Sequence, residues 1–206
     1  MELVFQQVKI QSQMEEVLER VSLENPLRKL VQDKALVYHS TMSPEEFDRF
    51  VLENGDLRIE RDKHGTIIIH PPMCFDSAFN KGRAFNLLSN WGYAHFELGY
   101  LLSPSGSFYL LDGSQHKADG AWVSRKRAIR MPEGERKKIP HVVPDFILEV
   151  RSETDRLGAL KKKMEEVWIA NGVQLAWLID PYSEKAWIYR VDGSIEKIEA
   201  FDTKLS

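Results

Sequence analysis

The chain has 206 residues and a mass of 23.8 kDa, which is enough for one substantial hydrophobic core and too little for two domains of ordinary size. Hydrophobic residues make up 43% and charged residues 29%, and no apolar run approaches the roughly 20 residues that span a membrane. The net charge of −3 argues against a protein whose whole surface coats nucleic acid. We therefore expect one globular domain that does not associate with a membrane.

The chain start and the cysteine content bear on the compartment. The first residues lack the basic stretch and the small-residue cleavage site of a secretory signal, so we expect a cytoplasmic location. The single cysteine, Cys74, cannot form an internal disulfide, and no other zinc ligands cluster around it in the sequence. We expect it to pack as a small apolar side chain.

The first 40 residues predict a helical extension. Between Gln11 and Val37 apolar residues recur at helical spacing, with an interruption at Asn25–Pro26 that predicts two short amphipathic helices. Their apolar faces need a surface to cover them, either the rest of the chain or a second copy. We therefore divide the chain into a helical extension over 1–40 and a single domain over 41–206.

Three elements are predicted in the following stretch. Ser43, Pro44 and Glu46 form the pattern of a helix start with a capping box, and the turn dipeptide Asn54–Gly55 should end that helix after about Leu52. A hairpin should follow, and then an amphipathic helix. The two strands of the hairpin are predicted at 57–60 and 66–70. The helix is predicted from about Asn80 to Leu88 or beyond.

The second half of the chain alternates strands with one helix. Strands are predicted at 108–111, 119–123, 142–151, 175–179 and 185–190, and a helix is predicted at 157–170. Because that helix separates two apolar strands, the strands at 142–151 and 175–179 should be parallel neighbours joined by a crossover. The predicted fold class is mixed α/β, with a central sheet flanked by helices.

The strand from Pro144 to Arg151 carries the first indication of chemistry. Alternation along a strand places Glu149 and Arg151 on one face, and burying such ions costs several kcal/mol unless a partner, a metal or a phosphate compensates. Asp119 and Glu149 would supply the carboxylates for metal-assisted phosphodiester hydrolysis, provided that their strands are neighbours. Asp145 lies about 13 Å along the strand from Glu149, which favours a structural role for it.

Two groups of basic residues could contact phosphate. A segment from Arg125 to Lys138 contains seven cations against two acids, and its first members, Arg125, Lys126 and Arg127, could hold a DNA backbone; a solvated loop without a partner is the alternative. On the helix at 157–170, Lys161, Lys162 and Lys163 lie close to two glutamates. They form either a solvated face with local ion pairs or the source of a catalytic cation.

Four ordered blocks of sequence resemble one family. They read Asn-Gly-Asp-Leu-Arg-Ile-Glu at 54–60, Ala-Asp-Gly-Ala-Trp-Val-Ser-Arg at 118–125, Pro-Asp-Phe-Ile-Leu-Glu-Val-Arg-Ser at 144–152 and Asn-Gly-Val-Gln-Leu-Ala-Trp-Leu-Ile-Asp-Pro at 171–181. Together they resemble the Uma-type restriction endonuclease family, a former domain of unknown function placed in the PD-(D/E)XK nuclease superfamily. The resemblance covers roughly residues 42–190 and implies a restriction-endonuclease-like mixed sheet flanked by helices.

The resemblance also implies roles for individual residues. Asp119 and Glu149 correspond to the two metal-binding acids, with Mg²⁺ or Mn²⁺ as the implied cofactor and DNA as the implied partner. Arg151 stands where the superfamily usually has lysine, and Glu60 matches an early position from which such nucleases often add an acid. Family members often carry a lysine in the following helix, and counting forward from Asp155 places it at Lys163.

The helix in this chain differs from the family pattern by one residue. Counting back from Gly172 places the lysine position at Met164 instead of Lys163, so the chain has one extra residue in this helix, and the catalytic lysine is one of Lys161, Lys162 and Lys163. A second departure is Ala118, which replaces the usual proline before the first acid.

Three hypotheses follow from the sequence. The first is a metal-dependent DNA endonuclease that uses Asp119, Glu149 and either Arg151 or a helix lysine, with a homodimer favoured because two strands must be cut. The second is a DNA-binding or regulatory module with the nuclease fold and no turnover, which the acidic net charge and Arg151 favour. The third is a self-associating protein whose amphipathic N-terminus forms the interface.

Overall fold

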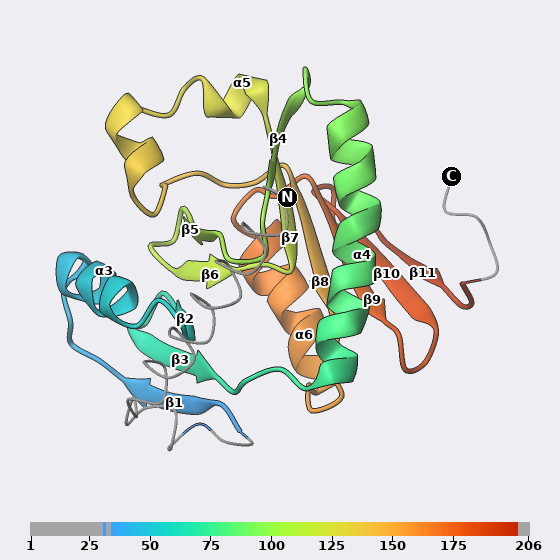
Figure 1. The fold of residues 1–206 in the computed structure, drawn as a ribbon, viewed down its shortest axis with the longest axis horizontal. Helices are drawn as coiled ribbons and strands as arrows, with labels where there is room; N and C mark the ends of the chain where they lie inside the picture. The colour runs from blue at the N-terminus through green and yellow to red at the C-terminus, as the bar shows by residue number, and fades with distance from the viewer. Residues whose placement is uncertain (1–30, 32–33, 202–206) are drawn as a thin grey trace, which may run out of the picture.

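The computed structural model describes Val31 and residues 34–201, and the predicted helices before residue 31 lie outside this part of the chain. The strands form two sheets, which lie side by side in Figure 1 with the helices arranged around them. The helical elements are α3 (Pro44–Glu53), α4 (Phe75–Ala94), α5 (Arg125–Ala128), a 3₁₀-helix (Glu133–Lys137), α6 (Leu157–Lys163) and a π-helix (Met164–Ile169) that continues α6.

The larger sheet is the mixed central sheet that the sequence predicts. Its spatial order is β11 (Ile195–Ile198), β10 (Lys185–Arg190), β9 (Leu175–Asp180), β8 (Phe146–Val150), β7 (Gly120–Ser124) and β4 (Gly99–Leu102). β8 and β9 are parallel, joined by α6 and the π-helix, and the other neighbours are antiparallel. The predicted crossover is therefore confirmed.

Helices cover both faces of this sheet. Ile147 of β8 packs in the main core with Met164 and Trp168 of the π-helix, whereas the next residue, Leu148, faces α4. Strand alternation sends these two neighbours to opposite faces. A Cβ atom at Gly120 would lie 2.9 Å from the Leu88 side chain, so the glycine allows α4 to pack close to the start of β7.

The smaller sheet is antiparallel and lies next to α3. Its order is β1 (Leu36–His39), β3 (Thr66–His70), β2 (Arg58–Arg61), β6 (Gln115–Lys117) and β5 (Ser107–Tyr109). Its core contains Phe47 and Val51 of α3 against Ile59, Ile67 and Ile69 of the hairpin. The Ser43 capping box is present, with Glu46 N donating to Ser43 Oγ and Ser43 N donating to Glu46.

Several predicted boundaries are wrong. The helical prediction fails at Leu36 and Val37, which belong to β1. The strand predicted at 142–151 begins only at Phe146, because Pro144 cannot donate to a sheet ladder. The helix expected from about Asn80 begins at Phe75. The short strands β4, β6 and β11 were not predicted, and no described helix is long and apolar enough to cross a membrane.

Candidate active site

Two buried acids meet where β7 and β8 run side by side. Asp119 directly precedes β7 and donates its backbone N–H to Leu148 O at 3.0 Å, and Gly120 is paired with Leu148, the neighbour of Glu149. Asp119 is 1% exposed and Glu149 is 3% exposed. The adjacency on which the sequence argument depends is therefore present.

A third acid, Glu60, reaches the same place from β2 of the smaller sheet. It is 2% exposed, and its Oε2 atom lies 3.1 Å from His116 Nδ1 and 3.6 Å from His70 Nε2. Its Oε1 atom lies 3.1 Å from Lys163 Nζ. The site thus lies at the junction of the two sheets, with acids supplied by both.

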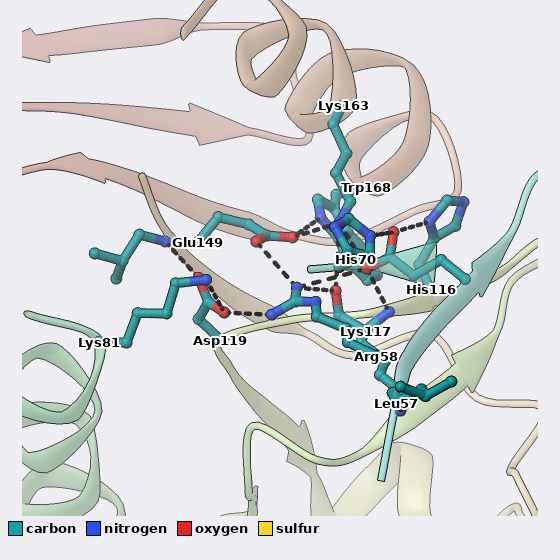
Figure 2. Close-up of polar contacts among 12 residues, drawn as sticks. Leu57, Arg58, His70, Lys81, His116, Lys117, Asp119, Glu149, Lys163 and Trp168 are labelled. Carbon is teal, nitrogen blue, oxygen red and sulfur yellow. Dashed lines mark hydrogen bonds and ion pairs between the residues drawn. The ribbon is translucent and has the colours of Figure 1, made fainter. Parts of the chain in front are cut away.

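Arg58 lies among all three acids. Its NH1 atom donates to Asp119 Oδ1 at 2.7 Å, and its NH2 atom lies 3.5 Å from Glu60 Oε1 and 3.9 Å from Glu149 Oε2. NH2 also donates to Lys117 O at 3.2 Å. Figure 2 shows the guanidinium between the carboxylates of Asp119 and Glu149.

Two lysines complete what we call the acid–cation cluster. Lys81 of α4 donates to Asp119 Oδ1 at 2.9 Å, from the opposite side to Lys163 in Figure 2. Lys163 bridges Glu149 Oε1 at 3.0 Å and Glu60, and Trp168 Nε1 donates to the same Glu149 oxygen at 3.0 Å. The acid–cation cluster consists of Glu60, Asp119 and Glu149 with Arg58, Lys81 and Lys163.

The charges of the cluster shift the pKa values of its members. Burial acts to raise the pKa of Asp119, but the charges of Arg58 and Lys81 outweigh it and hold the pKa below its usual range. Burial also acts to raise the pKa of Glu60, which Lys163 and the two histidines hold well below the usual range. Burial acts to lower the pKa of Lys163, yet Glu149 and Glu60 raise it above its usual value. All three groups are therefore charged at neutral pH.

The three helix lysines have different surroundings. Lys163 enters the acid–cation cluster, whereas Lys162 is exposed and lies 3.6 Å from Glu166, and Lys161 lies over the Trp187 ring at 4.2 Å. Lys163 is the last residue of α6, directly before the π-helix. The Ala170 N–H donates to Glu165 O, five residues back, so this turn holds one residue more than an α-helical turn. The helix therefore continues after Lys163 as a π-helix.

The acid–cation cluster opens onto a cleft with a volume of about 730 Å³. Arg58, Lys81 and Lys163 all line it, together with Glu60 and Glu149. Their side chains are 22%, 13% and 16% exposed, so each cation is partly accessible from the cleft. Other parts of the wall come from the stretch that follows β3, from the segment between β8 and α6, and from α6 and the π-helix.

Arg151 and Asp145 lie outside the cluster. β8 ends at Val150, and the Arg151 guanidinium binds Asp180 at 3.1 Å and lies over the Tyr182 ring at 5.6 Å. Asp145 accepts from Ser124 N at 2.7 Å and from Arg127 Nε at 2.9 Å. Among the described contacts, neither residue touches Asp119 or Glu149, so the structure gives both a place in internal ion pairs.

The three residues predicted to contact a DNA backbone differ in their exposure and in their internal hydrogen bonds. Arg127 is held by Asp145 and donates to Val143 O at 2.8 Å and to Gly172 O at 3.1 Å. Arg125 donates to Glu97 O and is exposed, and Lys126 is also exposed. None of the three lines the cleft.

Sequence reasoning missed several members of the site. Arg58, Lys81, His70, His116 and Trp168 were not singled out. Arg58 stands two residues before Glu60 on the same strand, which places both on one face, so alternation could have linked them. Lys81 carries no such signal, since its place depends on how α4 packs against β7.

The donor set matches a hard divalent cation, with one obstacle. Mg²⁺ and Mn²⁺ prefer carboxylate oxygens, and Mg²⁺ usually keeps several waters beside one or two protein acids. Asp119 and Glu149 supply such a pair, although the described residues contain no group of three side chains arranged to hold a metal. Arg58 now lies between these two acids. The residues therefore fit the cation if the Arg58 side chain moves aside.

Comparison with known families gives a match over most of the chain. The Uma2 family model, described as "Putative restriction endonuclease", matches residues 44–205. The chain belongs to this family. A search among curated proteins gives no match. The matched range includes every residue of the acid–cation cluster.

Comparison with solved structures gives two alignments. A crystal structure described as a putative nuclease of DUF820 from Anabaena variabilis ATCC 29413 aligns with a TM-score of 0.59 at 18% identity, covering 72% of this chain and 80% of the other. A DrdV–DNA complex aligns with a TM-score of 0.37 at 15% identity, covering 55% of this chain and 9% of the other. The first likeness shows that the chain has the fold of that protein.

Proposed function

We propose that the cleft hydrolyses phosphodiester bonds of DNA with the help of Mg²⁺ or Mn²⁺ held by Asp119 and Glu149. The observation that carries the proposal is that the buried acids Asp119 and Glu149 share the Arg58 guanidinium, and that Glu149, Arg58 and Lys163 line one cleft of an Uma2 chain. Metal-assisted hydrolysis needs carboxylates that can hold the ion, and a nearby cation can stabilise the charge that develops. The proposed reaction class is therefore endonucleolytic hydrolysis.

The cations of the acid–cation cluster have separate proposed roles. Arg58 and Lys81 line the cleft with N–H donors that can bind the oxygens of a scissile phosphate. Lys163 orients Glu149 through its 3.0 Å contact with the carboxylate. Its positive charge also lies next to the proposed metal ligand, where it can stabilise developing negative charge. When bound, the divalent cation supplies Lewis-acid stabilisation of the charge on the phosphoryl oxygens.

DNA needs further contacts to lie across the cleft. We propose Arg125 and Lys126 for this role, because both are exposed and belong to the basic segment. Arg127 has its guanidinium bound to Asp145 and to backbone carbonyls, so it is the weakest of the three candidates. Phosphate contacts of this kind position DNA without reading its sequence.

The proposal is tested by incubating the purified chain with supercoiled plasmid and either Mg²⁺ or Mn²⁺. Wild type should nick or linearise the plasmid, and Asp119→Ala and Glu149→Ala should not. The matched control is Asp145→Ala, which removes a carboxylate at the entry of the same strand outside the cluster. Cleavage that survives both site substitutions would exclude the proposed site.

One observation favours the alternative of a DNA-binding module without turnover. The three acids of the cluster are matched by three cations of the chain, so the site is already neutral without a metal. Such a protein would bind DNA with an affinity that falls as salt rises, and would cleave under neither cation. A filter-binding titration beside the plasmid assay separates the two functions.

A further inference from the structure

The outer side of α4 is unusually apolar for a surface helix. Of its 20 residues only Ser77 and Gly92 are buried. Phe75 is 82% exposed, Phe79 is 55% exposed and Leu87 is 71% exposed. A single exposed apolar side chain is ordinary, but large apolar side chains that are exposed next to one another, as Phe75 and Phe79 are, mark an interaction surface.

The exposed rings form a row along one side of the helix. Phe75, Phe79 and Arg83 are spaced four residues apart and therefore share a side, opposite to Ser77 and Lys81, which face the protein. The rings of Phe75 and Phe79 stack with centroids 6.4 Å apart, and the Arg83 guanidinium lies over Phe79 at 5.7 Å. Figure 1 shows α4 in front of the larger sheet, on the side toward the viewer.

The charges on this outer side are few and of opposite sign. α4 contains three charged residues, and Lys81 is engaged in the acid–cation cluster. The other two, Asp76 and Arg83, are seven residues apart, which is two helical turns, so they lie on the same side. Within residues 34–201, Asp76 has no ion-pair partner, and Arg83 contacts only the Phe79 ring.

We propose that the N-terminal half of α4 binds a second copy of the chain, with the two helices antiparallel about a twofold axis. An axis midway between Phe79 and Asn80 sets Asp76 of each copy against the partner's Arg83. Both ion pairs then form at once, as a twofold interface requires. The two Phe79 rings meet at the axis, where interfaces concentrate their binding energy.

The composition of the row favours a second copy over other occupants. Apolar rings with few charges are typical of the centre of a protein interface, whereas a DNA backbone would be repelled by Asp76. Aromatic side chains that bury about 150–250 Å² each supply a good share of the roughly 800 Å² per partner in a standard interface. The cleft is lined by Ser77 and Lys81 of the same half of α4, so both clefts would lie beside the interface.

The mass of the full chain in solution tests the interface. Sedimentation or light scattering should give twice the 23.8 kDa of one chain. Phe79→Glu should yield the monomer. Tyr93→Glu makes a similar change at another exposed ring of α4, 85% exposed but beyond the proposed contact, and should leave the dimer intact. A wild-type monomer, or a dimer unaffected by Phe79→Glu, would overturn the proposal.

An exchange of charges tests the antiparallel geometry without touching Phe79. Asp76→Arg and Arg83→Asp should each weaken the dimer by about tenfold, because each places like charges opposite one another. The double variant should restore the wild-type dimer constant. Circular dichroism confirms that each variant is folded. A double variant as weak as the singles, or a dimer lost only when residues 1–30 are deleted, would contradict this interface.

Discussion

Two groups of acids and cations lie near the ends of neighbouring strands and differ in how they are satisfied. Asp180, at the end of β9, accepts from Arg151 at 3.1 Å, from Ser183 Oγ at 2.7 Å and from Tyr182 N at 3.1 Å. It is one acid with one cation. In the acid–cation cluster three acids share three cations, and Arg58 alone contacts all three.

The comparison shows how an ion pair with a purely structural role can be distinguished from a binding or catalytic site. The carboxylate of Asp180 has its oxygens bound by neighbours from the same turn, so a ligand would gain no new contact there. In the acid–cation cluster Arg58 and Lys163 each contact more than one acid, and all three cations border a cleft, so their contacts can be exchanged for those of a phosphate or a metal. The sequence left Arg151 and the helix lysines open as the catalytic cation, and the geometry favours Lys163.

The largest expected effect is on catalysis. Lys163→Met should lower the rate of plasmid cleavage by about 100-fold or more, since it removes a positioned charge beside Glu149. Lys162→Met is the control, because that side chain is 69% exposed and its ion-pair partner among the described residues is Glu166. Single-turnover rates at saturating enzyme measure both. Equal rates for the two variants would remove Lys163 from the mechanism.

The second effect concerns stability at the other ion pair. Asp180→Asn should lower the free energy of unfolding by about 2 kcal/mol, since it weakens the charged hydrogen bonds from Arg151 and the following turn. Urea titration measures the change. The cleavage rate of the folded variant should stay near that of wild type. A large loss of rate with unchanged stability would show that this pair belongs to the active site.

The third effect is on metal affinity. Arg58→Met should tighten Mn²⁺ binding by about tenfold, equivalent to about 1.4 kcal/mol, because it removes the cation that lies between Asp119 and Glu149. Isothermal titration calorimetry measures the Mn²⁺ dissociation constant in the absence of DNA. Arg61→Met serves as the control: it removes a cation from the same strand whose guanidinium binds Met42 O instead. Unchanged or weaker binding would mean that Arg58 holds the acids in place.

The smallest effect is local and far from both ion groups. Ser43→Ala should lower the free energy of unfolding by about 1 kcal/mol, because it removes the side-chain cap of α3. Thermal or urea unfolding measures it, and cleavage should be unaffected. A change in cleavage would mean that α3 contributes to the site.

The parts of the fold that could be predicted from the sequence are those that depend on residues close together in the chain. The cap at Ser43, the hairpin and the crossover between β8 and β9 follow from neighbouring residues, and all three are confirmed. The short strands β4 and β11, four residues each, carry too little pattern to be recognised. They are held in place by their sheet neighbours.

The site itself was only partly predictable. Asp119 and Glu149 belong to recognisable strands, so their adjacency could be guessed. Arg58 reaches Asp119 across 61 residues and Lys81 reaches it across 38, from another sheet and from a helix. Such contacts depend on tertiary packing, which local patterns do not encode. The π-helix after Lys163 also became visible only in the structure.

A crystal soaked in Mn²⁺ tests the central claim that Asp119 and Glu149 hold a divalent cation once Arg58 moves aside. We expect an anomalous peak in contact with both carboxylates, and Arg58 NH1 displaced from its 2.7 Å contact with Asp119. If protein that cleaves DNA in the same Mn²⁺ shows no peak at these acids, or keeps Arg58 in its present place, the account is contradicted.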